Sequence, residues 1–378
     1  MDSAVRLLRD LVAIDSVNPS LVPGAAGEGA IAARIADELR AIGLDVEIHD
    51  VAPGRPNVVG VLEGRGRGRS LMFCGHTDTV GVEGMSAPFD PVDRGGRLYG
   101  RGSQDMKGGL AAMIDAARIV ASGGLAAGRL IVAAIVDEEF ASIGADALVS
   151  RWRAEGAVVT EPTDLRIATG HKGFAWFEIE TRGRAAHGSR PRDGRDAIMR
   201  MGRVLHALEA LDRRLQAKPP HPLLGTASLH ASIIDGGAEL SSYPDRCTLK
   251  LERRTLNDED DASVTRELTA VLDRLHHADP EFEGSLRALF SRPAYAIPSS
   301  HALVTALRKA MPLAMDADVV GMSFWTDAAV LGAAGIPSLL FGPGGAGLHS
   351  REEYVEIADV LRCRDGLAAL ARGWCSPT

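Results

Sequence analysis

Hydrophobic positions in much of the chain fall into short apolar runs bounded by turn residues, at residues 58–62, 71–74, 130–136, 157–159 and 338–341. Runs this short and this apolar are typical of strands that are buried on both faces of a mostly parallel sheet. Between the runs, apolar residues recur at helical spacing, as Ile31, Ile35 and Leu39 do. The alternation of strands and helices predicts an α/β domain built on a mostly parallel sheet.

The middle of the chain has a different, amphipathic pattern. It predicts four strands and two helices, in the order strand 174–181, helix 198–211, strands 227–234 and 247–254, helix 264–275 and strand 282–290. This βαββαβ order is that of a ferredoxin-like unit, which can stand as an insert in another domain. We therefore expect an α/β domain in two parts, residues 1–174 and 289–378, with a ferredoxin-like domain inserted at residues 175–288.

Length and composition agree with a folded protein of two domains. The 378 residues exceed the usual size of one compact core. Hydrophobic residues make up 46% and charged residues 24%, which is ordinary for a globular chain. The 42 basic and 50 acidic residues give a net charge of −8, so the chain lacks the basic surface that nucleic acids require. Nucleic acid is therefore excluded as an expected partner.

Targeting and redox signals point to the cytoplasm. Charged residues interrupt the amino-terminal apolar positions, so this segment predicts an amphipathic helix rather than a secretory signal. No apolar run reaches the length of a membrane span, and we expect no membrane partner. The four cysteines lie far apart without paired spacing, which favours reduced, structural thiols over disulfides or a zinc ribbon: Cys74, Cys247, Cys363 and Cys375.

Residues that can bind a metal follow several of the predicted buried strands. They are His76 after the run at 71–74, Asp137, Glu138 and Glu139 after 130–136, Glu161 after 157–159, and His349 beyond 338–341. Asp105 lies in the glycine-rich segment 99–109, just before a helical pattern. In open α/β sheets, ligands gather beyond the carboxyl ends of the strands, so these segments are expected to meet in one crevice.

Two histidines with several carboxylates form a donor set that suits Zn²⁺, Co²⁺ or Mn²⁺ rather than copper or an iron–sulfur cluster. Each fragment alone has a plainer interpretation, since acidic pairs are usually solvated and an aspartate before a helix is more often an N-cap. The acidic triplet Asp137, Glu138 and Glu139 is harder to explain in that way, because it directly follows a buried apolar strand. A bound cation would compensate its charge.

Seven motifs together resemble the M20 family of metallopeptidases, the group of acetylornithine deacetylases, succinyl-diaminopimelate desuccinylases, aminoacylases and glutamate carboxypeptidases. The motifs span nearly the whole chain in the family order: GHTDTV, YGRGSQDMKGG, DEEF, TEPT, AAHGSRP, LERRTL and GPGGAGLHSREEYV. The resemblance implies that the α/β domain is catalytic and that the insert is a lid, often used to form a homodimer. It also implies two divalent metal ions, with zinc as the first expectation and cobalt or manganese as alternatives.

Residue roles follow from the same resemblance. Asp105 is expected to bridge the two ions, with His76 and Glu161 completing one metal site and Glu139 and His349 the other. Glu138 is expected to be the unligated acid/base. Asp78, in the motif GHTDTV, resembles a carboxylate that orients the His76 ring and raises its basicity. A simple turn residue is the alternative for Asp78.

Two further residues of the insert match the family pattern. His187 is expected to stabilise the oxyanion, against the alternative of a surface loop histidine. Arg254 is expected to bind a substrate carboxylate, against the alternative of an exposed sheet arginine. A register error of one residue would exchange Arg254 with Arg253. Ser241 departs from the pattern, because many relatives have an asparagine there.

The expected activity is hydrolysis of the amide bond in an N-acyl amino acid or a related small substrate with a free carboxylate. A dipeptidase or carboxypeptidase on the same site is the alternative, because the amide chemistry is the same. A metal-binding protein without turnover is a more remote alternative.

Overall fold

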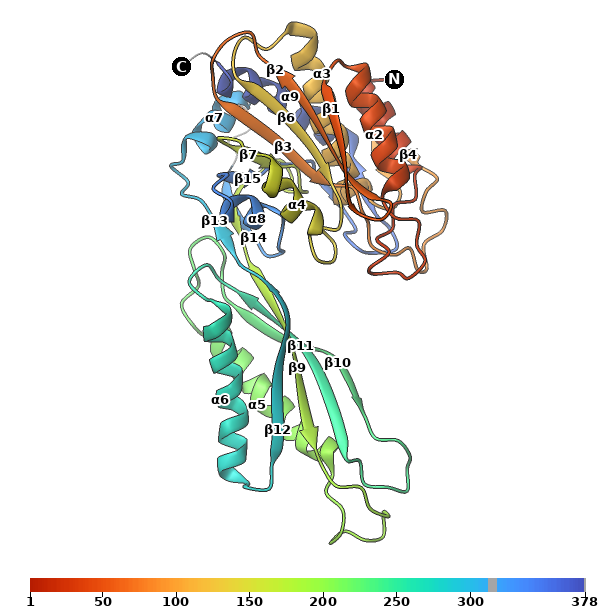
Figure 1. The fold of residues 1–378 in the computed structure, drawn as a ribbon, viewed down its shortest axis with the longest axis vertical. Coiled ribbons are helices and arrows are strands. Elements are labelled where there is room, and N and C mark those ends of the chain that lie inside the picture. The colour runs from red at the N-terminus through yellow and green to blue at the C-terminus, as the bar shows by residue number, and fades with distance from the viewer. Residues whose placement is uncertain (312–317, 377–378) are drawn as a thin grey trace. The chain divides into compact units, whose positions relative to one another are not determined.

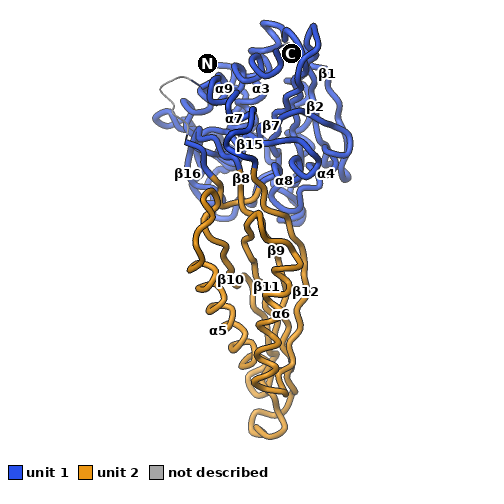
Figure 2. Tube along the Cα trace, turned by 90° about the vertical axis from the view of Figure 1, so that its left-hand side faces the viewer, with its two compact units in different colours: residues 1–169, 297–320, 326–378 blue, residues 170–296, 321–325 orange. Residues whose placement is uncertain are grey.

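The computed structural model describes residues 1–311 and 318–376, and these form two compact units (Figures 1 and 2). The first unit comprises Met1–Thr169, Ile297–Val320 and Thr326–Thr378. The second comprises Gly170–Ala296 and Gly321–Trp325, so the predicted insert at residues 175–288 falls within it. Within the described ranges, none of the helices combines the length and apolar character needed to cross a membrane.

Helices and strands alternate through the first unit. Its helices are α1 (Ser3–Val12), α2 (Gly29–Ala41), α3 (Gly108–Gly123), α4 (Ile143–Arg151), α7 (Ala302–Ala310), α8 (Ala328–Ala333) and α9 (Ile357–Trp374). The large sheet contains β1 (Asp45–Ala52), β2 (Arg55–Glu63), β3 (Ser70–His76), β6 (Arg129–Ile135), β7 (Ala157–Val159), β15 (Ser338–Leu340), β8 (Ile167–His171), β13 (Tyr295–Ala296) and β14 (Val319–Met322).

The large sheet has a parallel centre and antiparallel margins. Its strand order is β1-β2-β6-β3-β7-β15-β8-β13, with β14 paired to β8. Strands β6, β3, β7 and β15 run parallel to one another, whereas β1, β2, β8 and β13 pair antiparallel. The predicted α/β class is confirmed, and the parallel part of the sheet is formed by its four central strands. Strand β1 was missed because its segment DVEIHDVA is half polar and partly exposed at the sheet edge.

Both faces of the central strands are buried. Leu130, Val132 and Ala134 of β6 belong to one hydrophobic core with residues of α1, α2, α3, α7 and α9. The alternate residues Ile131 and Ala133 are equally buried but lie outside that core. They face the side where α4 contacts β6 and α8 contacts β15. Because successive side chains of a strand point to opposite faces, a two-sided cover produces the uninterrupted apolar runs of the sequence.

The second unit is an antiparallel sheet with two helices. Its elements are β9 (Gly173–Arg182), α5 (Ala197–Gln216), β10 (Ser228–Gly236), β11 (Arg246–Thr255), α6 (Asp261–Ala278) and β12 (Glu283–Arg292). The strand order β10-β11-β9-β12 is that of the predicted βαββαβ unit. Asp196 and Asp260 cap the two helices by accepting backbone N–H groups of Met199 and Ser263. These caps explain where the amphipathic patterns of α5 and α6 begin.

A small third sheet holds the loop of the carboxyl-terminal motif against the glycine-rich segment. Its strands, in the order β16-β17-β5-β4, are β16 (Gly345–Ala346), β17 (Tyr354–Glu356), β5 (Arg97–Tyr99) and β4 (Val92–Arg94). Strand β17 pairs with β5 through Val355 and Leu98. This pairing joins segments that are about 250 positions apart in the chain, and it brings the segment before α3 close to the one that carries His349.

Candidate metal centre

Three parallel strands end beside one another and deliver the candidate ligands. His76 is the last residue of β3, the acidic triplet follows β6, and Glu161 follows β7. The carboxyl ends of adjacent parallel strands lie at one edge of the sheet, which explains why residues far apart in sequence converge here. Asp105 comes from the irregular turn Ser103–Lys107 before α3, and its peptide bond to Met106 is cis.

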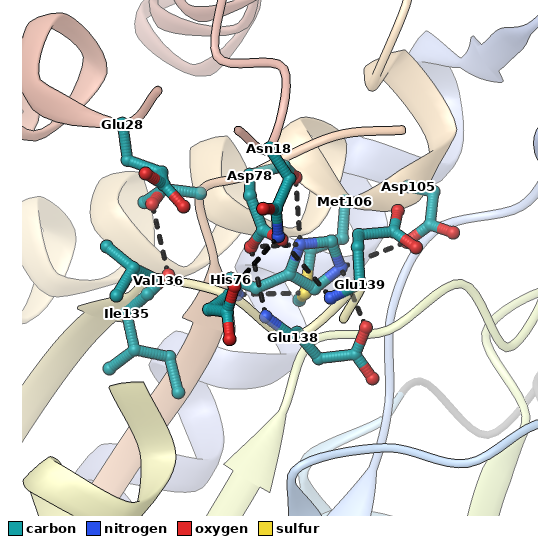
Figure 3. A network of polar contacts seen from close by, with 12 residues as sticks. Asn18, Glu28, His76, Asp78, Asp105, Met106, Ile135, Val136, Glu138 and Glu139 are labelled. Atoms are coloured by element: carbon teal, nitrogen blue, oxygen red, sulfur yellow. Dashed lines mark hydrogen bonds and ion pairs between the residues drawn. The ribbon is translucent and has the colours of Figure 1, made fainter. Parts of the chain in front are cut away.

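Asp105 lies between the two histidines. Its Oδ1 is 3.1 Å from His76 Nε2, and its Oδ2 is 3.3 Å from His349 Nε2. Glu139 Oε2 is 3.2 Å from His349 Nε2, and Glu161 Oε1 is 3.9 Å from His76 Nε2. Figure 3 shows Asp105, His76 and Glu139 directed toward one another. The structure therefore brings all five predicted ligands together, with one Asp105 oxygen facing each histidine.

Glu138 lies in the same cluster, on the His76 side. Its Oε2 is 4.0 Å from His76 Nε2. Ligand atoms of His76, Glu138 and Glu161 fall within 4.8 Å of one another, as do those of His76, Asp105 and Glu139. Geometry alone thus permits Glu138 either as a ligand beside Glu161 or as a free carboxylate next to a metal site.

Two carboxylate oxygens in the cluster are buried without a hydrogen-bond partner. Among the described residues, neither Glu139 Oε1 nor Glu161 Oε1 has a hydrogen-bond donor in reach. A buried anionic oxygen without a donor is costly, and a divalent cation is the partner that would compensate both. Histidine nitrogen and carboxylate oxygen are also the donors that Zn²⁺, Co²⁺ and Mn²⁺ accept. The residues present therefore fit a pair of such ions.

The ionisation of the cluster reflects an excess of carboxylates. Burial, and then the charge of Glu161, raise the pKa of Glu138 well above its ordinary value. Burial likewise raises the pKa of Glu161 and of Glu139, with the Asp105 charge adding to the shift. Burial opposes ionisation of Asp105 too, but hydrogen bonds with His349 and His76 keep its pKa below the usual value. The site thus favours added positive charge.

Asp78 supports both sides of the cluster. Its backbone carbonyl oxygen lies 3.0 Å from His76 Nδ1 and its Oδ1 lies 3.5 Å away, so the main chain makes the closer contact with the ring. The Asp78 carboxylate also accepts the backbone N–H groups of Glu138 and Glu139, at 3.2 and 3.1 Å. Asp78 is therefore a buried, fully engaged residue between the strand ends rather than a surface turn residue.

Glu353 holds the backbone that carries Asp105, and sequence reasoning missed it. Its carboxylate accepts the N–H groups of Gly102, Gln104 and Asp105 at 2.9 to 3.0 Å and pairs with Arg101 at 2.7 Å. Buried Asn18, Glu28 and Arg55, which are linked by hydrogen bonds to Asp137 at the start of the acidic triplet, were also missed as functional residues. Their only signal was polar character, because no motif of short spacing links them.

His187 and Arg254 belong to the second unit, whereas the metal cluster belongs to the first. His187 is exposed in the loop after β9, and its Nδ1 lies 2.9 Å from Ser189 Oγ. It pairs with Ser242, and the neighbouring Gly188 N–H donates to Ser241 O at 2.7 Å. The departure from the family pattern at Ser241 is thus located beside the His187 loop.

The two arginines of β11 lie on opposite faces of their sheet. Arg253 is buried on the helix side, where it pairs with Glu259 and Glu267. Arg254 is about one third exposed, pairs through Nε with Glu252 at 2.6 Å and lies over the Phe174 ring. The strand register therefore leaves Arg254, not Arg253, as the accessible guanidinium.

Comparisons with known proteins agree with this arrangement. The N-formyl-4-amino-5-aminomethyl-2-methylpyrimidine deformylase of Bacillus subtilis is 28% identical over 99% of this chain and 95% of its own. An acetylornithine deacetylase of Myxococcus xanthus is 30% identical over 89% of this chain and 90% of its own. The alignments span both units of the structure.

Solved structures show the same fold at lower identity. A tripeptidase of Staphylococcus aureus superposes with a TM-score of 0.81, at 20% identity over 98% of this chain and 97% of that one. A Bacillus subtilis protein described as a dinuclear metal-binding M20 peptidase has a TM-score of 0.73, at 16% identity over 98% of this chain and 96% of that one. At these identities the likeness establishes the fold.

The profile of peptidase family M20/M25/M40 matches residues 72–373, which include all five candidate ligands and Glu138. That match, together with the two relatives, confirms the family resemblance of the motifs and identifies a hydrolytic enzyme. A metal-binding protein without turnover, the remote alternative, is not supported. The chain belongs to peptidase family M20/M25/M40.

Proposed function

We propose that this enzyme hydrolyses the amide bond of a small N-acyl substrate that carries a carboxylate, with two divalent metal ions in the cluster. The arrangement of Asp105 carries the proposal, because one of its oxygens faces His76 and the other faces His349. His76 and Glu161 would complete one metal site, and Glu139 and His349 the other. Zinc is the first choice, with cobalt or manganese as alternatives for the same donors.

When bound, a pair of divalent ions lowers the pKa of a water molecule and polarises the scissile carbonyl, which removes the need for a protein nucleophile. Glu138 would accept the proton from the attacking water and pass it to the departing amine. Its position suits this role, because the carboxylate is close to His76 and its burial favours proton uptake. The Asp78 carboxylate would keep Glu138 in place by accepting the backbone N–H of Glu138.

His187 is the proposed donor to the developing oxyanion. His187→Ala should lower kcat by about 100-fold or more and change KM far less, since an oxyanion donor acts in the transition state. Steady-state kinetics of the purified variant will measure the two constants. His206→Ala is the matched control, because His206 is an exposed histidine of the same unit on α5. Equal changes in kcat and KM for His187→Ala would contradict the oxyanion role.

Arg254 is the proposed carboxylate anchor. Arg254→Lys should raise KM about 10- to 100-fold with a smaller change in kcat, because a hydrogen bond to a charged group contributes about 1.5–3 kcal/mol. The measurement is repeated on a substrate whose carboxylate is replaced by an amide, where wild type and variant should become equal. Arg246→Lys is the control, since Arg246 is an exposed arginine of the same strand. An unchanged difference on the amide substrate would refute the anchor.

The named activities of the relatives favour deacylation. The two curated relatives are a deformylase and a deacetylase, at 28 and 30% identity, whereas the tripeptidase likeness at 20% identity shows the fold alone. The experiment is a screen of the metal-loaded enzyme against N-formyl and N-acetyl amino acids and against dipeptides, read by release of free amine. Turnover of acyl substrates with little dipeptide cleavage is expected. The opposite preference would establish the peptidase alternative.

Two finer expectations complete the proposal. The second unit presents an edge strand, β10, with Ile233 and Ile234 exposed, and such an edge suits pairing with a second copy of the chain. A homodimer is therefore proposed. All four cysteines are free and buried, in keeping with a reducing compartment, and the cytoplasm is the proposed location.

A further inference from the structure

The turn that carries Glu138 and Glu139 begins at a buried aspartate with left-handed backbone geometry. Asp137 is 1% exposed and has a φ of 71°. Its carbonyl oxygen accepts the N–H groups of Ala141 and Ser142, and its Oδ2 accepts the Ala141 N–H at 3.2 Å. A non-glycine residue held in this region stores strain, so surrounding contacts must maintain it.

The amino-terminal segment supplies one of those contacts. Asn18 Nδ2 donates to Asp78 Oδ2 at 2.8 Å and to Asp137 Oδ1 at 3.1 Å. The Asn18 backbone N–H also donates to Thr79 O, and Val17 pairs with Thr79. The fully buried Asn18 amide thus joins Asp78, which accepts the N–H groups of Glu138 and Glu139 (Figure 3), to Asp137, which starts their turn.

Arg55 and Glu28 extend this contact into a buried chain of charges. Arg55 Nη2 is 2.7 Å from Asp137 Oδ1 and 3.2 Å from Asn18 Oδ1. Its Nε donates to Glu28 Oε2 at 2.8 Å, and Glu28 is fully buried. The guanidinium fork therefore fixes Asn18 and Asp137 together and neutralises part of the carboxylate charge around them.

We propose that Asn18 and Arg55 are positioning residues that set the place of Glu138 and Glu139 through Asp78 and Asp137. The inference rests on the proposed roles of Glu138 as acid/base and Glu139 as metal ligand. It assigns a part in catalysis to Asn18 and Arg55, which lie before β3 in the chain and supply no metal ligand. Outer partners of a metal site typically change affinity or activity by about 10- to 100-fold when removed, which sets the expected scale.

The first test is Asn18→Ala, because it removes both amide bonds and introduces no charge. The variant should lose about 10- to 100-fold in kcat with little change in KM. In a titration with Zn²⁺ measured by calorimetry, one of the two ions should lose more affinity than the other. The reason is that Glu139 depends on the displaced turn, whereas Glu161 follows a different strand, β7.

The second test is Asn18→Asp, which keeps the size of the side chain but faces a carboxylate toward Asp78 and Asp137. If the donor amide positions the turn, Asn18→Asp should lose at least as much kcat as Asn18→Ala. If Asn18 only fills space, Asn18→Asp would be the milder variant, and the proposal would be overturned. Arg55→Lys, which retains the charge without the fork, should show the same pattern of kcat and metal loss.

A stability control separates positioning from general destabilisation. Arg364→Met removes a largely buried arginine of the first unit. Arg364 pairs with Asp2 and with Asp115, which lies on α3. The substitution should lower the melting temperature while kcat and both metal affinities stay at wild-type values. If Asn18→Ala lowers the melting temperature but, like Arg364→Met, leaves kcat and metal binding unchanged, Asn18 is structural and the inference fails.

The same assays distinguish failure of this inference from failure of the proposed function. Glu138→Gln tests the acid/base role without involving Asn18. If Glu138→Gln is inactive and Asn18→Ala is fully active, the positioning role alone is wrong. If Glu138→Gln is fully active, the proposed function itself is wrong and the turn has no acid/base to position.

Discussion

Glu138→Gln should lower kcat by about 100- to 10,000-fold while the enzyme still binds two metal ions. General acid–base catalysis by one positioned side chain contributes a factor of this size, and glutamine cannot exchange the proton. The neutral amide has nearly the same shape, and the Glu138 N–H can still donate to Asp78. Steady-state kinetics and elemental analysis of the metal-loaded variant will measure turnover and metal content.

The geometry allows a rival role that this experiment separates. Glu138 Oε2 lies 4.0 Å from His76 Nε2 and groups with Glu161, so it could be a ligand instead of a free base. A ligand role would be revealed by loss of one metal ion from Glu138→Gln. Glu139→Gln is the matched control, because its carboxylate contacts His349 at 3.2 Å and its loss should weaken metal binding.

Asp105→Ala should abolish activity and leave the protein unable to hold the pair of ions. One carboxylate faces both histidines, so a single truncation removes a donor from both proposed sites. The loss should go well beyond the factor of about 10 to 100 that outer-shell partners contribute. Metal content after dialysis against a weak chelator, together with kcat, provides the measurement.

A buried aspartate outside the cluster provides the comparison for Asp105. Asp115 on α3 is 1% exposed and pairs with Arg118 and Arg364. Asp115→Ala should be less stable than wild type but should retain two ions and normal turnover. If Asp105→Ala still bound two ions per chain, Asp105 could not be the bridge.

The positions of the strand ends that carry the metal cluster were predictable, because a buried parallel strand has a simple sequence pattern. The apolar run at residues 130–136 corresponds closely to β6 (Arg129–Ile135), and the acidic triplet follows it as expected. Once three such strands are parallel and adjacent, their carboxyl ends meet, and His76, Glu139 and Glu161 converge without further assumptions.

The face of the sheet on which a strand residue lies depends on the register of strand pairing, and the sequence does not determine that register. Arg253 and Arg254 are neighbours with similar chemistry, and only the pairing of β11 with β9 places one inside and one outside. A shift of one residue would have exchanged them. The antiparallel margins of the large sheet were missed for a related reason, because short or half-polar strands such as β13 and β1 lack a distinctive pattern.

The support of the cluster was not predictable, because it is made by contacts between distant segments. Asn18 and Asp137 are 119 residues apart, and Glu353 and Asp105 are 248 residues apart. Polar residues in loops are usually solvated, so nothing in the local sequence of Asn18 or Glu353 indicates burial. The glycine-rich segment and the HSREEYV motif suggested function, but the hydrogen bonds that join them depend on the folded chain.

The central claim is that the separated histidines and carboxylates bind two metal ions, with Glu138 unbound beside them. Anomalous diffraction from crystals of the zinc-loaded enzyme, collected at the zinc absorption edge, tests it directly. The expected result is two peaks, one touching His76 and Glu161, the other touching Glu139 and His349, with Asp105 contacting both. A single peak, peaks elsewhere, or coordination by Glu138 in place of Asp105 would contradict the account.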